Sequence, residues 1–138
     1  MKKITMVLTI LILLGLPATG LAQQIAFLII DADSYLVNKA INSLELPAKI
    51  TVKFFTHADI STDQSAQRFI EHSQTIIVDV MMKELSTYLI ENVNISQKRI
   101  YAIRKSRDDE GLQKAGFIFD PAIYEYFSNL SVNNIRNL

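Results

Sequence analysis

The sequence predicts an α/β domain: an open, doubly wound, mostly parallel sheet of about four strands with flanking helices. Short apolar runs alternate with segments of helical period along the chain. The first and third of these runs are almost continuously apolar, as expected for strands that helices cover on both faces. Strands that alternate with helices imply parallel βαβ units with right-handed crossovers.

The first unit and the start of the second lie before residue 56. Residues 25–30 (IAFLII) form the first predicted strand. Ser34 can cap the helix that follows, because its hydroxyl oxygen can accept a backbone N–H. The apolar residues of this helix recur at spacings of three and four: Leu36, Val37, Ala40, Ile41 and Leu44. Pro47 ends the unit, and residues 50–55 (ITVKFF) are the second predicted strand.

The next two units repeat the same order. A helix is predicted for residues 62–73, a strand for residues 75–80 (TIIVDV), a helix for residues 82–91 and a strand for residues 99–103 (RIYAI). The inward sides of these two helices are predicted to carry Ala66, Phe69 and Ile70 in the first, and Leu85, Leu89 and Ile90 in the second.

The pattern changes after the fourth strand. A charged loop, a short helical piece and an apolar strip follow at residues 104–110, 111–115 and 116–119. Asp120 and Pro121 then begin a helix, because an acceptor suits the N-cap and proline suits the first turn. Its buried face is predicted to carry Ile123, Tyr126, Phe127 and Leu130. Residues 132–138 are predicted to form one more helix.

The N-terminus has the pattern of a secretory signal peptide. Lys2 and Lys3 precede an apolar segment at residues 6–14, and the small residues Gly20 and Ala22 stand where a signal peptidase site needs them. The predicted division is a signal peptide at residues 1–22 and one α/β domain at residues 23–138. The protein is therefore expected to be secreted or periplasmic, with membrane contact only through the signal peptide.

Composition excludes several classes of function. The chain has no Cys, so it can form neither disulfides nor thiolate metal sites. Its 14 basic residues equal its 14 acidic ones, and without Lys2 and Lys3 the acidic residues are in excess, so nucleic acid is not expected as a partner. Outside the signal only Gly111 and Gly116 remain, so no glycine loop follows the first strand to hold a phosphate. No HExxH or GxSxG motif occurs, and we predict no catalytic residue, no metal ligand and no particular cofactor.

Ligands of open α/β sheets bind beyond the carboxyl ends of the strands. Six polar residues are candidates for ligand binding by this position alone: Asp31, Asp33, Ser34, His57, Asp79 and Arg104. Each also has an ordinary structural interpretation. Asp33 and Ser34 can cap a helix, His57 can be an exposed loop histidine, and Arg104 belongs to a loop that can pair its own charges.

The third predicted strand resembles one element of a signalling domain. IIVDVMM at residues 76–82 is similar to the phosphoacceptor strand of response-regulator receiver domains, with FLIIDAD before it and Lys105 after a later strand. Receivers carry two adjacent acids after the first strand, whereas Ala32 separates Asp31 from Asp33 here. Phosphorelay also needs cytosolic kinases, so a receiver is the least favoured interpretation of an exported chain.

A second resemblance covers most of the predicted domain. IAFLIIDADS, IIVDVM, GFIFD at residues 116–120, the Tyr126–Phe127 pair and LSVNNI at residues 130–135 follow one another in this order. Together they resemble the N-terminal region of CobN-type proteins, the large subunits of cobaltochelatase and magnesium chelatase. The resemblance implies a chelatase module concerned with tetrapyrrole or cobalamin metal chelation, whose partners are a tetrapyrrole or the remaining chelatase domains and subunits.

The resemblance reaches only the first subdomain of that family, whose members are many times longer. No catalytic residue can therefore be carried over, and the chain alone is expected to be inactive, whether it is a natural truncation or a fragment. The alternative is an independent extracytoplasmic α/β domain that binds a small ligand at its strand ends, like one lobe of a solute-binding protein.

Overall fold

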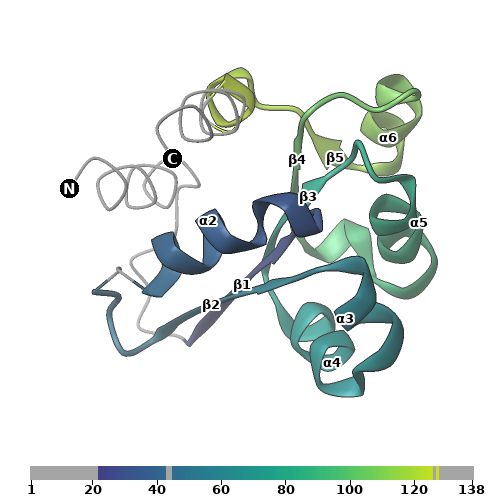
Figure 1. Cartoon of the computed structure of the whole chain (residues 1–138). Helices are drawn as coiled ribbons and strands as arrows, with labels where there is room; N and C mark the ends of the chain where they lie inside the picture. The colour runs from purple at the N-terminus through teal and green to yellow at the C-terminus, as the bar shows by residue number, and fades with distance from the viewer. Residues whose placement is uncertain (1–21, 43–44, 126, 128–138) are drawn as a thin grey trace.

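The computed structural model describes residues 22–42, 45–125 and 127. They form a five-stranded parallel sheet in the order β2-β1-β3-β4-β5, flanked by helices (Figure 1). The strands are β1 (Gln23–Leu28), β2 (Ile50–Phe55), β3 (Thr75–Asp79), β4 (Arg99–Ile103) and β5 (Phe117–Ile118). The predicted α/β class with a doubly wound parallel sheet is confirmed.

The strands follow from their apolar runs. All five residues of β3 are buried, because β1 and β4 flank it and helices cover both its faces. The fifth strand, β5, lies in the segment that was expected to be only an apolar strip. It has two residues and pairs with β4, with Phe117 opposite Ile100 and Ile118 opposite Tyr101. The sheet therefore has one more strand than expected.

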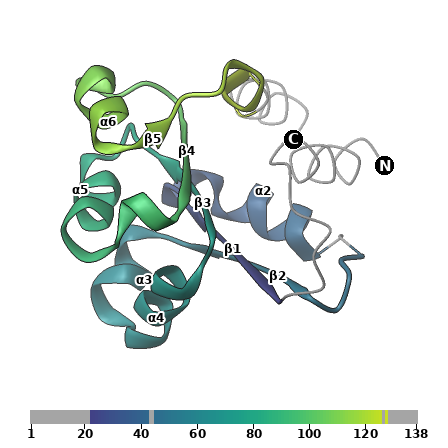
Figure 2. The same ribbon diagram turned by 180° about the vertical axis from the view of Figure 1, so that it is seen from behind.

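The helices cover the sheet on both faces. They are α2 (Asp31–Asn42), α3 (His57–Thr62), α4 (Gln64–His72), α5 (Lys83–Asn92) and α6 (Asp109–Ala115), with a short 3-10 turn, η1 (Ile95–Gln97). Residues 121–125 are also helical. One core cluster contains Val37 and Ala40 of α2 together with Ile123 and Phe127. A second lies on the opposite face under α3, α4, α5 and α6, and Figure 2 shows this arrangement from behind.

Several helix boundaries differ from the sequence prediction. The helix α2 begins at Asp31, so Ser34 lies inside its first turn and is not its N-cap; the Ser34 hydroxyl donates to the Asp31 carbonyl (2.7 Å). The helix expected at residues 62–73 is α4, and a further helix that was not expected, α3, precedes it. Asp63 separates them, because its side chain accepts the backbone N–H of Ser65 and caps α4.

The inward face of α5 is partly as predicted. Leu85 and Leu89 are fully buried, and the prediction for these two residues is confirmed. Ile90 was predicted to face inward but is 48% exposed. The reason is helix geometry. Leu85 and Leu89 are four residues apart and share a face, whereas Ile90 is turned by about 100° from Leu89.

Part of the prediction concerns residues that the structure does not describe. The signal peptide as far as residue 21, Leu44, Tyr126, Leu130 and the helix at residues 132–138 lie outside the described residues. Within the described ranges, no helix combines the length and the hydropathy needed to cross a membrane.

Candidate functional site

The strand order reverses its direction between β1 and β3. The chain leaves β1 toward β2 on one side and leaves β3 toward β4 on the other, which is the switch point where open α/β sheets bind ligands. Of the six predicted site residues, the structure brings three together here. Asp33 lies in the first turn of α2, Asp79 is the last residue of β3, and Arg104 follows β4 directly.

Arg104 bridges the two carboxylates. Its Nη2 donates to Asp33 Oδ2, and its Nη1 lies 2.8 Å from Asp79 Oδ2 in an ion pair whose alignment is not that of a hydrogen bond. The side chains of Arg104, Asp33 and Asp79 are 16%, 11% and 0% exposed. We call these three residues the Arg104 triad. It ties α2, β3 and the end of β4 to one another.

Asp79 carries the buried charge of the triad. Its Oδ1 accepts the backbone N–H of Met81 (3.0 Å). Burial raises the pKa of Asp79 above its ordinary value, while the charge of Arg104 and the Met81 N–H lower the pKa and the charge of Asp33 raises it further. The ionised form is therefore costly at this position, and Arg104 provides the largest compensation for its charge.

The backbone of Arg104 has an uncommon conformation. Its φ is 66°, and among the described residues it is the only non-glycine residue with a positive φ. Side chains other than glycine pay about 1–2 kcal/mol for this left-handed region. A residue held there must be fixed by its surroundings, and two partly buried ion pairs do this for Arg104.

The other three predicted site residues do not join the triad. Asp31 is exposed at the start of α2, where a negative charge suits the helix dipole. Ser34 donates to the carbonyl of Asp31, as described above. His57 is exposed and begins α3, with Nε2 3.5 Å from the Ser61 hydroxyl. Among the described residues, no side-chain hydrogen bond or ion pair links any of these three to the Arg104 triad.

The chemistry of the triad follows from its pairing. Both carboxylates already face a guanidinium, so neither is free to serve as a base or to receive an incoming cation without displacing Arg104. Within the described ranges, no three or more His, Asp or Glu side chains are arranged to hold a metal ion. The arrangement is that of a clamp between three elements.

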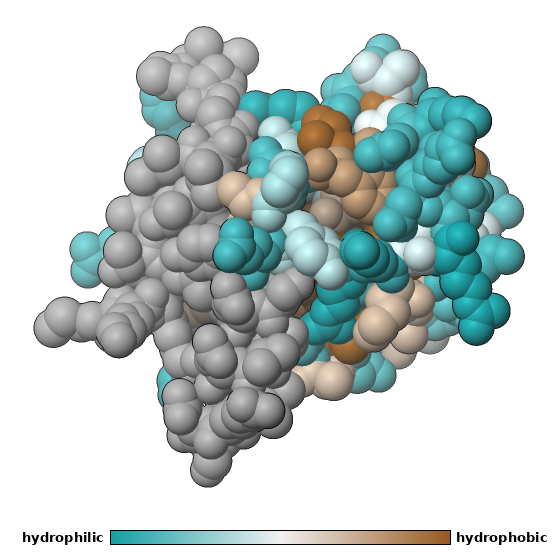
Figure 3. Space-filling view, turned by 90° about the horizontal axis from the view of Figure 1, so that it is seen from above, coloured by the Kyte–Doolittle hydropathy of each residue, from teal (hydrophilic) through white to brown (hydrophobic). Residues whose placement is uncertain are grey.

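A hollow of about 530 Å³ lies at the carboxyl ends of β3 and β4, between α5 and α6. Its lining comes from the two strand ends and these two helices: Val80, Met81, Lys83, Glu84, Ser86, Thr87, Ile90, Ser106, Arg107, Asp108 and Leu112. We call it the α5–α6 hollow. Figure 3 looks down on the side where the chain passes from β4 into α6, and hydrophobic surface appears there among hydrophilic groups. Sequence reasoning missed this site because it placed Ile90 in the core.

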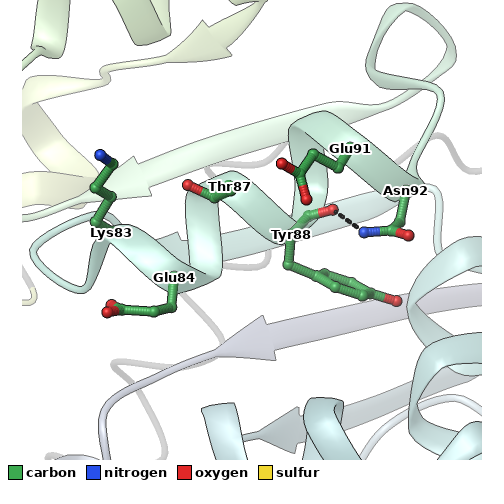
Figure 4. A pocket seen from close by; sticks show the side chains of 6 residues that line it. All are labelled: Lys83, Glu84, Thr87, Tyr88, Glu91 and Asn92. Atoms are coloured by element: carbon green, nitrogen blue, oxygen red, sulfur yellow. Dashed lines mark hydrogen bonds between the residues drawn. The ribbon is translucent and has the colours of Figure 1, made fainter.

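A second, smaller hollow of about 380 Å³ runs along the outer side of α5 (Figure 4). All six residues that line it belong to this one helix: Lys83, Glu84, Thr87, Tyr88, Glu91 and Asn92. Asn92 donates to the Tyr88 carbonyl (3.0 Å), so its amide satisfies the helix itself. Because its described lining comes from one helix alone, this hollow is a shallow furrow on the surface of α5.

Comparison with known proteins gives no family assignment. No protein-family model, no curated protein and no solved structure matches this chain significantly.

Proposed function

We propose that this chain is a non-catalytic module of an exported CobN-like chelatase, contributing structure and binding while other domains or subunits insert the metal. The main support for a non-catalytic role is that Arg104 forms ion pairs with both Asp33 and Asp79. At the position where an α/β sheet would present reactive groups, Asp33 and Asp79 both pair with a residue of the same chain. Such a site stabilises the fold and offers no free acid or base.

The residues that carry the family resemblance have structural roles, which supports a module. In the GFIFD segment, Phe117 is buried and forms half of the edge strand β5. The Asp120 carboxylate accepts the backbone N–H of Ala122 (2.9 Å), as an N-cap does at the start of a helix. Phe127, from the Tyr-Phe pair, is buried in the core cluster on the α2 face.

Export is supported by where the sheet begins. Gln23, the first residue after the predicted cleavage site, is also the first residue of β1, and its N–H donates to the Lys49 carbonyl (2.7 Å). Cleavage after Ala22 would thus leave every residue of the sheet in place. The protein recovered from the secreted or periplasmic fraction should have an intact mass corresponding to a start at Gln23.

Metal insertion tests the catalytic part of the proposal. The purified protein, mixed with a free porphyrin and Co²⁺, should convert porphyrin to metalloporphyrin no faster than buffer or heat-denatured protein does, as followed by absorbance. The same result is expected for cobalt-free corrin precursors. Insertion clearly faster than in both controls would show a catalytic site in this chain and overturn the non-catalytic assignment.

The genomic neighbourhood tests the link to chelatases. We expect neighbouring genes to encode further CobN-like domains or proteins for cobalt, corrin or haem transport. Sequencing the flanking DNA decides this. A neighbourhood without any tetrapyrrole or cobalt gene would count against the chelatase link and favour an independent ligand-binding domain.

A further inference from the structure

The α5–α6 hollow has the size and position of a ligand site. Its volume of about 530 Å³ lies within the ~300–1,000 Å³ that is common for small-molecule pockets. It opens at the carboxyl ends of β3 and β4, and both ribbon views place α5 beside α6 (Figures 1 and 2). Two separate segments thus form its walls, residues 80–90 and residues 106–112.

The hollow presents apolar side chains. Val80 and Leu112 are buried at 1% and 8% exposure, whereas Met81 and Ile90 are 56% and 48% exposed. A large apolar side chain left in water forgoes about 1.5–3 kcal/mol of burial free energy. Of the four exposed large hydrophobic residues in the described part of the chain, these two line the same hollow. A ligand with an apolar body would cover both.

The charges around the hollow favour an anion. Lys83 and Arg107 both line it, and neither forms an ion pair with a described residue. Asp108 also lines it and keeps its negative charge, but its Oδ1 accepts the Gly111 N–H (3.0 Å) and faces the N-terminus of α6. Glu84 is the one remaining acid in the lining, and it is exposed. The lining thus carries two cations and two carboxylates, and because one carboxylate is held at the N-terminus of α6, a ligand anion would meet two cations that have no described partner.

We propose that the α5–α6 hollow binds a small amphipathic carboxylate. The apolar body of the ligand lies against Met81, Ile90 and Leu112, and the carboxylate of the ligand pairs with Lys83 and Arg107. This goes beyond the module proposal and holds whether or not the chain belongs to a chelatase. Two kinds of ligand have this combination of an apolar body and a carboxylate. One is an alkyl chain with a terminal carboxylate, and the other is a flat ring system with carboxylate side chains.

Calorimetric titration of the protein purified from cells that express the full-length gene tests the charge requirement. Dodecanoate should bind about tenfold or more tightly than dodecylammonium of the same chain length. Lys83→Ala and Arg107→Ala should each weaken dodecanoate binding by about tenfold and leave dodecanol binding unchanged. Glu84→Gln should strengthen dodecanoate binding, because it removes a negative charge from the lining. Lys114→Ala, an exposed lysine on α6 outside the lining, is the matched control and should change nothing.

A second arm tests the apolar part. Ile90→Asn should weaken dodecanoate and dodecanol alike by about tenfold, since about one buried side chain of contact is lost. Ile118→Asn is the matched control, because Ile118 is exposed on β5 and does not line the hollow. Thermal melts of all variants show that they remain folded.

Competition between dodecanoate and a porphyrin dicarboxylate distinguishes these two kinds of ligand. If the porphyrin displaces dodecanoate at lower concentration, a ring ligand is favoured, and the reverse order favours a chain. The proposal is overturned if neither carboxylate binds, or if both bind and Lys83→Ala, Arg107→Ala and Ile90→Asn leave their affinities unchanged. Because none of these titrations measures metal insertion, their failure is separate from failure of the module proposal.

Discussion

Replacing Arg104 with alanine should lower the free energy of unfolding by about 3–5 kcal/mol, the usual cost of removing one partner of a buried ion pair. Asp79 is fully buried and Asp33 nearly so, and Arg104 is the cation that faces both. Without it, the charge of Asp79 remains in the interior with one backbone N–H as its described hydrogen-bond donor. Urea melts at neutral pH measure the loss.

The loss should shrink in mildly acidic buffer. Burial already raises the folded-state pKa of Asp79 above its ordinary value of 3.8, and removing Arg104 raises the pKa further. A carboxyl whose pKa is higher in the folded state takes up its proton more readily there, so lowering the pH favours the folded protein. The destabilisation is therefore full above the folded-state pKa of Asp79 and is relieved as the pH falls through it.

Three variants separate this effect from a general loss of an arginine. Lys114→Ala removes an exposed ion pair with Glu110 and should cost less than about 1 kcal/mol. Arg104→Lys should recover part of the stability, because a lysine keeps the charge but lacks the fork that reaches two carboxylates. Arg104→Ala combined with Asp79→Asn should be more stable than Arg104→Ala alone, since no buried charge is left unpaired. A melt of Arg104→Ala equal to that of Lys114→Ala would mean that the triad does not form in solution.

The strands could be predicted because their sequences leave little choice. The run TIIVD in β3 and the run IAFL within β1 are apolar enough to need cover on both faces, and their alternation with helices implies a parallel sheet. The strand β5 could not be predicted in the same way. It has two residues, and its pairing with β4 rather than a pattern of its own makes it a strand.

The helix α3 was missed for a similar reason. It has six residues, and Ile60 is the one that is buried, so no helical period can be seen in its sequence. A signal was nevertheless present at its start. Thr56 and Asp59 form a capping box, in which each side chain accepts the backbone N–H of the other, and Thr-x-x-Asp is readable from the sequence.

The candidate site was half predictable. The rule that ligands meet the carboxyl ends of strands placed Asp33, Asp79 and Arg104 at one edge of the sheet. Their pairing depends on β1, β3 and β4 being neighbours, and on a left-handed backbone at Arg104 that nothing in the local sequence indicates. To predict the α5–α6 hollow, the orientation of α5 about its axis would have to be known to within one residue, because the exposed Ile90 directly follows the buried Leu89.

The Arg104 triad and the α5–α6 hollow both lie at the carboxyl ends of the strands, but they differ in how far their groups are already paired. The Arg104 triad is closed, since its polar groups are buried and paired with one another. The α5–α6 hollow is open, with exposed apolar side chains and cations that have no described partner. A ligand would gain more by covering the hollow than by breaking the triad, which is why binding is proposed at the hollow and stability at the triad.

Phe127→Ala should also lower the free energy of unfolding by about 3–5 kcal/mol, as large-to-small aromatic changes in cores do. Phe127 is 7% exposed and belongs to the core cluster on the α2 face of the sheet. Its ring lies 6.2 Å from that of Phe27 in β1, at an interplanar angle of 48°. Truncation would therefore remove both the buried area and a tilted aromatic pair.

His57→Ala is the matched comparison for Phe127→Ala, because both variants lose a ring but only one ring is buried. His57 is exposed at the start of α3, so its replacement should change stability by no more than about 0.5 kcal/mol. Urea melts of the two variants under the same conditions give the ranking. If His57→Ala cost more than Phe127→Ala, the helix that begins at residue 121 would not pack on the sheet as described, and the face beneath it would need another cover.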